Sequence, residues 1–129
     1  MNIATINQLA AINQYHLEGF MLTQKETECL NACNDCAVAC LYCASECLKE
    51  VEPNMMARCV ALNIECADFC RITVASIARV SIHMKAICKI CEEVCQNCAN
   101  ECGKHEMECC KNCAKTCKRC ADLCGGMLQ

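Results

Sequence analysis

The sequence predicts an all-α protein: an antiparallel, up-down-up-down four-helix bundle with an extra N-terminal helical segment. The chain has 129 residues with 4 Gly and 1 Pro, so few residues interrupt a helix. Cysteine and apolar residues recur at steps of three and four positions, the period of one helix face. The segments that carry this period are about twenty residues long, and their short connections make consecutive helices antiparallel neighbours.

The clearest periodicity is carried by the cysteines, of which the chain has 20. From Cys29 to Cys47 the steps between them are four, three, four, three and four, which keeps one stripe of a helix facing a partner. The same rhythm returns from Cys88 to Cys102 and from Cys110 to Cys124, with a sparser copy from Cys59 to Cys70. Leu or Ile would ordinarily fill such stripes. The sequence therefore predicts a bundle interior lined with sulfur.

The chain divides into a cysteine-free N-terminal part and the cysteine-lined bundle. Residues 1–22 carry apolar residues at roughly helical spacing, which favours an amphipathic helix packed on the bundle or on another subunit. Thr23 and Glu26 form a candidate capping box at the start of the first bundle helix. We therefore expect an N-terminal helical extension over residues 1–22 and the bundle over residues 23–129.

Local signals set the helix boundaries. Pro53 suits the first turn of a helix, where its missing N–H is not needed. Ser81 is the best N-cap for the third helix, and Gly103 is a natural C′ residue. The four helices are expected at residues 24–50, 53–80, 82–102 and 104–124. The inward stripe of the second helix is expected to read Met55, Cys59, Leu62, Cys66, Cys70, Thr73, Ile77 and Val80.

The composition restricts where the protein works and what it binds. The formal net charge is −3 with scattered basic residues, which indicates no nucleic-acid surface. No apolar run is long enough for a membrane span, and Lys25 is the first Lys or Arg, so the basic start of a secretory signal is lacking. We therefore expect a cytoplasmic protein with reduced thiols. Disulfides are disfavoured because cysteines on one helix face seldom reach the required geometry.

The recurring unit within each stripe is a pair of cysteines four residues apart, such as Cys36 and Cys40. On a helix such residues have Cβ atoms about 5–6 Å apart and lean the same way. A metal–thiolate bond is about 2.3 Å, so a near-linear S–metal–S unit needs sulfurs about 4.6 Å apart. Small rotamer changes bring the pair to that distance. Cu(I) is the soft ion that accepts so few ligands, and thiolate and thioether groups both suit it.

Charge balance points to the same ion. Each Cu(I) that displaces one thiol proton leaves the charge of the interior unchanged, which avoids the large cost of burying net charge. A zinc site with four thiolates is doubly negative, and the 20 cysteines would make five of them. The pattern therefore predicts multiple Cu(I) ions per chain.

Other function classes compete with Cu(I) storage. A zinc or mixed-metal thiolate buffer is the main alternative, although helical spacing does not favour tetrahedral Cys-x-x-Cys knuckles. An iron–sulfur electron carrier is less favoured because the sequence lacks the ferredoxin run Cys-x-x-Cys-x-x-Cys. A metal-free thiol bundle also competes, since a buried Cys packs as a small hydrophobe. No catalytic arrangement stands out among the 3 His, so we expect no enzyme.

The candidate metal ligands are the cysteines together with softer or imidazole side chains near the helix ends. Met55 and Met84 each stand four residues before a cysteine and extend the stripes with thioethers. His105 and Met107 precede a cysteine pair, which favours a role in metal uptake at one end of the bundle. The cysteine ligands are Cys29, Cys33, Cys36, Cys40, Cys43, Cys47, Cys59, Cys66, Cys70, Cys88, Cys91, Cys95, Cys98, Cys102, Cys109, Cys110, Cys113, Cys117, Cys120 and Cys124.

These motifs resemble the bacterial copper storage proteins, and most of all their cytosolic branch. The resemblance is carried by the Cys29–Cys47 ladder, by NMMARCVALNIECADFC, and by ICKICEEVCQNCANECGKH followed by CCKNCAKTCKRCADLC, and it covers residues 23–124. It implies a four-helix bundle filled with many Cu(I) ions on cysteine thiolates, commonly assembled as a homotetramer.

The resemblance also implies copper uptake at one bundle end through His or Met residues. His105 matches that feature, whereas Met107 and Cys109 stand where close relatives are expected to carry further His. The expected function is therefore a non-enzymatic, cytoplasmic Cu(I) store or buffer. Its copper donor is expected to be a copper chaperone or a low-molecular-weight thiol.

The reduced protein is expected to fold without metal. Protonated thiols are neutral and pack as small hydrophobes, and the capping and turn signals at Thr23, Pro53 and Gly103 depend on no ion. Circular dichroism of the metal-free protein should show nearly the helical content of the Cu(I)-loaded protein, with a higher melting temperature after loading. A random-coil spectrum that becomes helical only when Cu(I) is added would show that metal drives folding.

Overall fold

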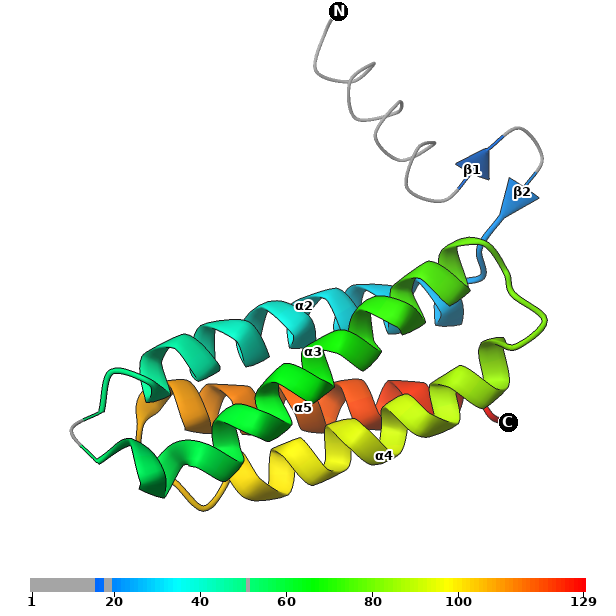
Figure 1. The fold of residues 1–129 in the computed structure, drawn as a ribbon. Coiled ribbons are helices and arrows are strands. Elements are labelled where there is room, and N and C mark those ends of the chain that lie inside the picture. The colour runs from blue at the N-terminus through cyan, green and yellow to red at the C-terminus, as the bar shows by residue number, and fades with distance from the viewer. Residues whose placement is uncertain (1–15, 18–19, 51) are drawn as a thin grey trace, which may run out of the picture.

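The computed structural model describes residues 16–17, 20–50 and 52–129, and four long helices make up most of it (Figure 1). They are α2 (Gln24–Cys47), α3 (Ala57–Ala78), α4 (Met84–Cys102) and α5 (Glu108–Gly126). The main packing is between α2 and α3, α3 and α4, α4 and α5, and α5 and α2, so the helices form a closed ring of antiparallel neighbours. The four-helix bundle expected from the sequence is confirmed.

The connections divide between the two ends of the bundle. The α2–α3 and α4–α5 connections lie at one end, which we call the His105 end after a residue of the second connection (Figure 1). The α3–α4 connection, the start of α2 and the C-terminus lie at the opposite end, which we call the Met84 end. Among the described residues, the helices are not apolar enough over a sufficient length to cross a membrane.

Thr23 begins α2 through the predicted capping box. The backbone N–H of Glu26 donates to Thr23 Oγ1 at 3.0 Å, and the backbone N–H of Thr23 donates to Glu26 Oε1 at 2.8 Å. The helix ends at Cys47, earlier than expected, because backbone N–H groups just beyond it bond to carbonyls three residues back and tighten the chain into a turn. A single 3₁₀ turn, η1 (Pro53–Met56), then leads into α3.

The starts of α4 and α5 differ from the expected positions. Ser81, the expected N-cap, accepts a hydrogen bond on its Oγ from the backbone N–H two residues later at 3.0 Å, and α4 begins at Met84. Gly103 has φ −64° and continues the right-handed turn instead of adopting the left-handed conformation typical of a C′ residue. The connection is therefore longer than expected, and α5 starts at Glu108 and not at Lys104.

The described end of the N-terminal extension is not helical. β1 (His16–Leu17) and β2 (Phe20–Met21) form a short antiparallel pair, with His16 opposite Met21 and Leu17 opposite Phe20. The helix expected over residues 1–22 is wrong at these positions, and its remainder at residues 1–15 and 18–19 lies outside the described residues. The sequence has a Gly at position 19, between the two short strands, and glycine disfavours a helix interior and is common in hairpin loops.

The inward stripe of α3 differs from the expected one at three positions. Met55 is 73 % exposed and Val80 is 42 % exposed, and Leu62 is only partly buried, while Met56 and Asn63 are buried in their place. The expected stripe was chosen to include apolar residues. In the folded helix, inward positions follow one another at alternating steps of three and four residues, and these steps bring the polar residue Asn63 inward. The buried residues that follow these steps are Met56, Cys59, Asn63, Cys66, Cys70, Thr73 and Ile77, and Ala67 and Ser76 beside them are buried as well.

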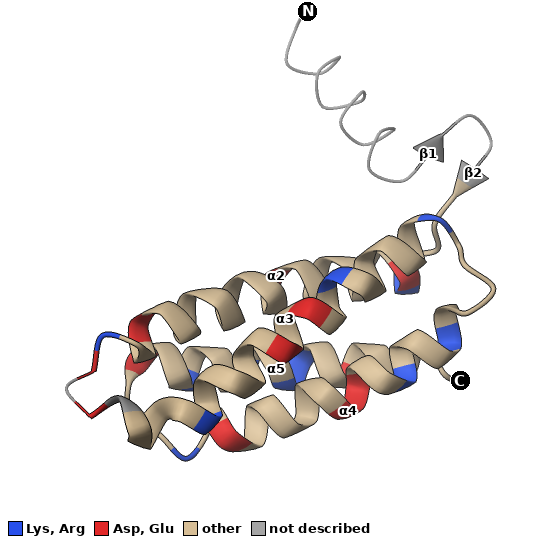
Figure 2. Cartoon of the chain, in the orientation of Figure 1, with Lys and Arg blue, Asp and Glu red and all other residues tan. Residues whose placement is uncertain are grey.

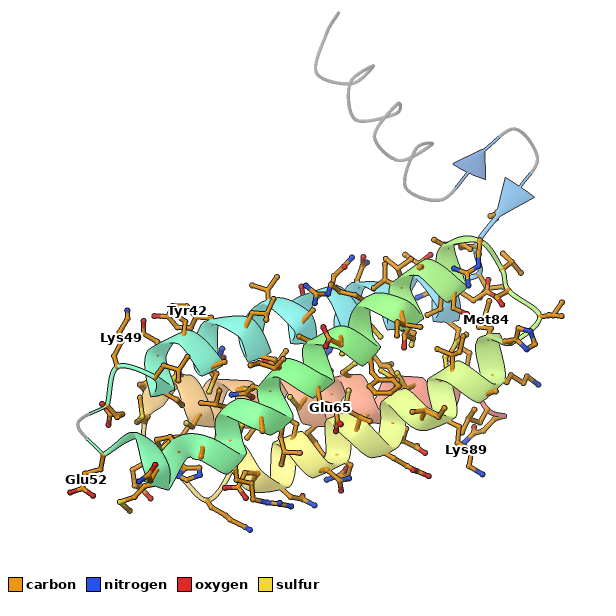
Figure 3. The ribbon with its side chains drawn as sticks, in the orientation of Figure 1. Tyr42, Lys49, Glu52, Glu65, Met84 and Lys89 are labelled. Atoms are coloured by element: carbon orange, nitrogen blue, oxygen red, sulfur yellow. The ribbon has the colours of Figure 1, made fainter. Side chains whose placement is uncertain are left out.

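Charged side chains are spread over the outside of the bundle. Acidic and basic residues are intermixed along the helices (Figure 2), and Lys49 and Lys89 extend away from the bundle axis (Figure 3). Of the ion pairs between described residues, two lie within a single helix: Arg71 Nη2 to Asp68 Oδ1 at 2.6 Å and Lys118 Nζ to Asp122 Oδ1 at 2.6 Å. Exposed pairs of this kind contribute at most about 1 kcal/mol each. The stability of the bundle therefore depends on its interior.

The turn that ends α3 places Val80 in the left-handed region, with φ 49°. The backbone N–H of Ser81 donates to the carbonyl of Ser76 at 3.0 Å, and that of Val80 donates to the carbonyl of Ile77 at 3.0 Å, which is the Schellman arrangement. Glycine usually occupies this position, and a β-branched residue there is strained by roughly 1–2 kcal/mol. A valine at the glycine position explains why the sequence marks this turn only weakly.

Replacing Val80 with Gly is expected to raise the free energy of unfolding of the reduced, metal-free protein by about 0.5–1 kcal/mol, because it removes the left-handed strain. Urea denaturation followed by circular dichroism measures the change. The control is Val80→Ala, which keeps a Cβ atom at the same φ and should give no gain. Equal stabilisation by Gly and Ala would contradict the strain explanation.

Candidate metal centre

The interior of the bundle is a column of thiols. Nineteen of the 20 cysteines have no exposed surface, and Cys109 is partly exposed. All of them are free thiols. The heptad steps keep each stripe on the inner face over the length of its helix. The structure therefore brings the predicted cysteines together in one continuous core.

Sulfur atoms approach one another both along and between helices. On one helix, cysteines four residues apart have close Sγ atoms, as the spacing predicted: Cys36–Cys40 at 4.0 Å, Cys43–Cys47 at 3.9 Å, Cys91–Cys95 at 3.8 Å, Cys98–Cys102 at 4.0 Å and Cys113–Cys117 at 3.7 Å. Some contacts between helices are closer still, with 3.5 Å between the Sγ atoms of Cys36 and Cys117 and 3.5 Å between those of Cys59 and Cys102. A two-coordinate metal needs sulfurs about 4.6 Å apart, so small side-chain rotations suffice.

Groups of four thiols overlap along this column, with the four Sγ atoms of a group all within 4.8 Å of one another. Four of these groups are Cys33–Cys91–Cys120–Cys124, Cys36–Cys66–Cys70–Cys95, Cys40–Cys98–Cys113–Cys117 and Cys43–Cys47–Cys59–Cys110. Cys36 and Cys66 also form a group with Cys40 and Cys117, so neighbouring groups share ligands. An isolated tetrahedral site keeps four ligands of its own. The overlap therefore favours metal clusters bridged by thiolates over separate zinc sites.

Asn63 is a fully buried amide inside the thiol column, and the sequence analysis missed it. Its Oδ1 accepts hydrogen bonds from the thiols of Cys98, Cys102 and Cys113 at 3.1, 3.4 and 3.3 Å. Its Nδ2 donates to Cys59 Sγ at 3.7 Å. These contacts satisfy an amide whose burial is otherwise costly. Its inward position could have been predicted from the alternating steps of three and four residues between inward positions, because Asn63 is four residues after Cys59.

Three thiols at the His105 end, those of Cys47, Cys109 and Cys110, are held in the protonated form. Burial raises the pKa of Cys47 and of Cys109 to about 12, and burial also raises the pKa of Cys110. The thiolate is the form that binds metal. A metal ion that binds here must displace a proton, so binding releases protons and weakens as the pH falls.

The His105 end has a partly open rim. The side chain of His105 is 20 % exposed, and its Nε2 lies 2.8 Å from Oε2 of Glu101. Met107 and Cys109 line a surface pocket between α2 and α5. Met55 belongs to the same end but is exposed and lies off the inner stripe. Of the side chains expected at this end, the structure gathers His105, Met107 and Cys109 at the rim and leaves Met55 outside.

The Met84 end is closed by apolar side chains. Met84 is 8 % exposed, and Met127 and Ile77 are buried with it. Met84 lies by the α3–α4 connection (Figure 3). Met127 was not predicted because the last helix was expected to end at Cys124, whereas α5 continues to Gly126 and Met127 caps it.

Cys109 is expected to be the first thiol modified in the folded, metal-free protein, because the other cysteines have no exposed surface. Iodoacetamide labelling followed by peptide mass spectrometry should place the first alkyl group on Cys109, at a rate that rises steeply with pH because its pKa is raised to about 12. Cys109→Ser should abolish this first step. Simultaneous labelling of several cysteines would contradict the buried column.

Comparisons with known proteins agree with this geometry. The family model described as copper storage protein matches residues 22–129. The Cu(I)-bound copper storage protein BsCsp3 is 40 % identical, with a TM-score of 0.79 over 82 % of this chain and 100 % of that chain. Apo Csp3 from Bacillus subtilis is 39 % identical, with a TM-score of 0.74 over 79 % of this chain and 97 % of that chain.

A third structure extends the likeness over most of the sequence. The copper storage protein Ccsp from Streptomyces lividans, loaded with 10 copper equivalents, is 30 % identical, with a TM-score of 0.81 over 95 % of this chain and 97 % of that chain. The fold, the thiol column and the family match all agree with the resemblance inferred from the cysteine ladder. This chain belongs to the copper storage protein family.

Proposed function

We propose that this protein stores Cu(I), binding multiple ions per chain through cysteine thiolates inside the bundle. The observation that carries the proposal is the continuous column of buried free thiols, whose four-sulfur groups share ligands. Cu(I) takes few soft ligands, and thiolates can bridge neighbouring ions, so shared ligands suit it. The Cu(I)-bound BsCsp3 and the copper-loaded Ccsp support the same assignment.

Charge explains how the interior accepts so many ions. Each Cu(I) replaces one thiol proton, so the charge of the core is the same before and after loading. The protons leave for solvent, and the buried column gains no net charge that the helices would have to compensate. A zinc or mixed-metal buffer lacks this balance, because each separate four-thiolate zinc site adds two negative charges.

The proposed ligands are the 20 cysteines, with Met84 at the closed end and His105 and Met107 at the rim. Met55 is not included among the interior ligands because its side chain is exposed. The protein is proposed to act as a non-enzymatic store in the cytoplasm, where thiols stay reduced. A copper chaperone or a low-molecular-weight thiol is proposed as the donor.

A homotetramer is the proposed assembly. Its support on this chain is the outer surface of α2, where Val38 is 69 % exposed and Tyr42 is 59 % exposed. These side chains line a groove between α2 and α5 together with Lys115 and Arg119. An apolar surface rimmed by charge is typical of a subunit interface.

The Cu(I) capacity of the fully reduced protein is expected to be about one ion per thiol, on the order of twenty per chain, because proton replacement keeps the core neutral. Anaerobic titration against a strong chromophoric Cu(I) chelator measures the capacity. Saturation near four or five ions would favour separate tetrahedral sites and contradict the store.

Copper is expected to enter through the His105 end. The double variant His105→Ala, Met107→Ala should load more slowly from a chelator complex, since it removes the imidazole and the thioether at the rim, while final capacity stays almost unchanged. Met84→Ala, at the closed end, is the matched control and should load at the rate of the unmodified protein. If the double variant also loads at the rate of the unmodified protein, the side chains at the rim have no role in copper uptake.

A further inference from the structure

A buried carboxylate lies beside the rim histidine. The side chain of Glu101, in the last turn of α4, is 9 % exposed. Its Oε2 lies 2.8 Å from His105 Nε2, and its Oε1 lies 3.3 Å from Arg58 Nε and 3.5 Å from Lys104 Nζ. One carboxylate thus joins the first turns of α3, the end of α4 and the connection to α5. Hydrogen bonds to charged groups of this kind are stronger than neutral ones.

The residues of this cluster are sequence neighbours of cysteines in the thiol column. Arg58 and Glu101 directly precede Cys59 and Cys102, whose Sγ atoms are 3.5 Å apart inside the bundle. The backbone N–H of His105 donates to the carbonyl of Cys102 at 3.1 Å. The imidazole is therefore held one turn beyond the last buried thiol of α4, by its backbone on one side and by Glu101 on the other.

The hydrogen bond to Glu101 decides which ring nitrogen of His105 is free. A carboxylate only accepts hydrogen bonds, so the nitrogen that faces it, Nε2, carries the proton. In a neutral imidazole the other nitrogen, Nδ1, then holds the lone pair that binds a metal ion. Carboxylates that hold metal-binding histidines in one tautomer and orientation recur in metal sites.

We propose that Glu101 is a positioning residue for copper uptake: it holds His105 in the Nε2–H tautomer and leaves Nδ1 as the nitrogen that receives Cu(I) before the thiols. This inference rests on the proposed uptake role of His105. Sequence spacing did not single out Glu101, because a Glu before a cysteine has no metal-ligand signature.

The test compares two replacements of Glu101 in the full chain. Glu101→Gln keeps an acceptor oxygen, whereas Glu101→Met has similar length and keeps none. Loading from the Cu(I)–bicinchoninate complex is followed by stopped flow, and the ¹⁵N shifts of the His105 ring report its tautomer in the metal-free protein. Glu106→Met is the matched control, because Glu106 lies at the same end with a side chain that is 95 % exposed.

Glu101→Met is expected to mix the His105 tautomers and to slow loading roughly tenfold, as loss of such a partner does at other metal sites. Glu101→Gln should keep the Nε2–H tautomer and load close to the unmodified rate. Glu106→Met should also load normally, and total capacity should stay the same in each variant. In a His105→Ala background, Glu101→Met should cause no further slowing, because the carboxylate acts through the imidazole.

Four results would overturn the inference. Normal loading by Glu101→Met, with slow loading by His105→Ala, would leave the uptake role of His105 intact and remove the positioning role of Glu101. Equal slowing by Glu106→Met, or further slowing in the His105→Ala background, would show that negative charge at this end acts directly. Normal loading by His105→Ala would remove the uptake role itself and the inference with it, while the capacity titration decides separately whether the protein stores Cu(I).

Discussion

Contact between buried thiols of neighbouring helices is the interaction on which the rest of the structure depends. Sγ atoms of Cys36 and Cys117, on α2 and α5, are 3.5 Å apart. A cysteine side chain is short, so such contacts require helix axes that lie close together. Fully or nearly buried alanines such as Ala32, Ala67 and Ala121 flank the thiols and allow that approach. A register shift of one residue in any helix would turn a whole stripe away from the core, which explains the strict heptad steps.

The same interior must suit two states of the protein. Protonated thiols pack as small hydrophobes, and their replacement by Cu(I) thiolate leaves the charge of the core unchanged. Neither state requires the helices to move far, because the sulfurs already lie within the span of a metal–dithiolate unit. Ion pairs on the exposed surface add little stability, so the thiol packing, the capping box at Thr23 and the turns hold the bundle together.

The heptad steps allowed the bundle, its topology and the inward position of the cysteines to be predicted from the sequence. Contacts between helices could not be predicted in this way, because spacing within one helix does not give the rotation of its neighbours. Asn63 was missed because an inward amide contradicts the expectation of an apolar stripe, and only its contacts with thiols of α4 and α5 make it stable there. Glu101 was missed for a similar reason: its partner Arg58 lies 43 positions earlier in the chain.

The left-handed Val80 shows the limit of local propensity, since the closure of the bundle overrides the preference of a β-branched residue.

The helices contribute unequal numbers of cysteines to the column, and this affects which of them copper can connect. The cysteines of α3 are Cys59, Cys66 and Cys70, all in its first two thirds, and the rest of its inner face carries Thr73, Ser76 and Ile77. Copper that bridges thiolates of different helices would act as a crosslink among α2, α4 and α5 along the thiol column. The last turns of α3 carry no cysteine, so near the Met84 end this helix would be held by side-chain packing alone, in the loaded protein as in the metal-free one.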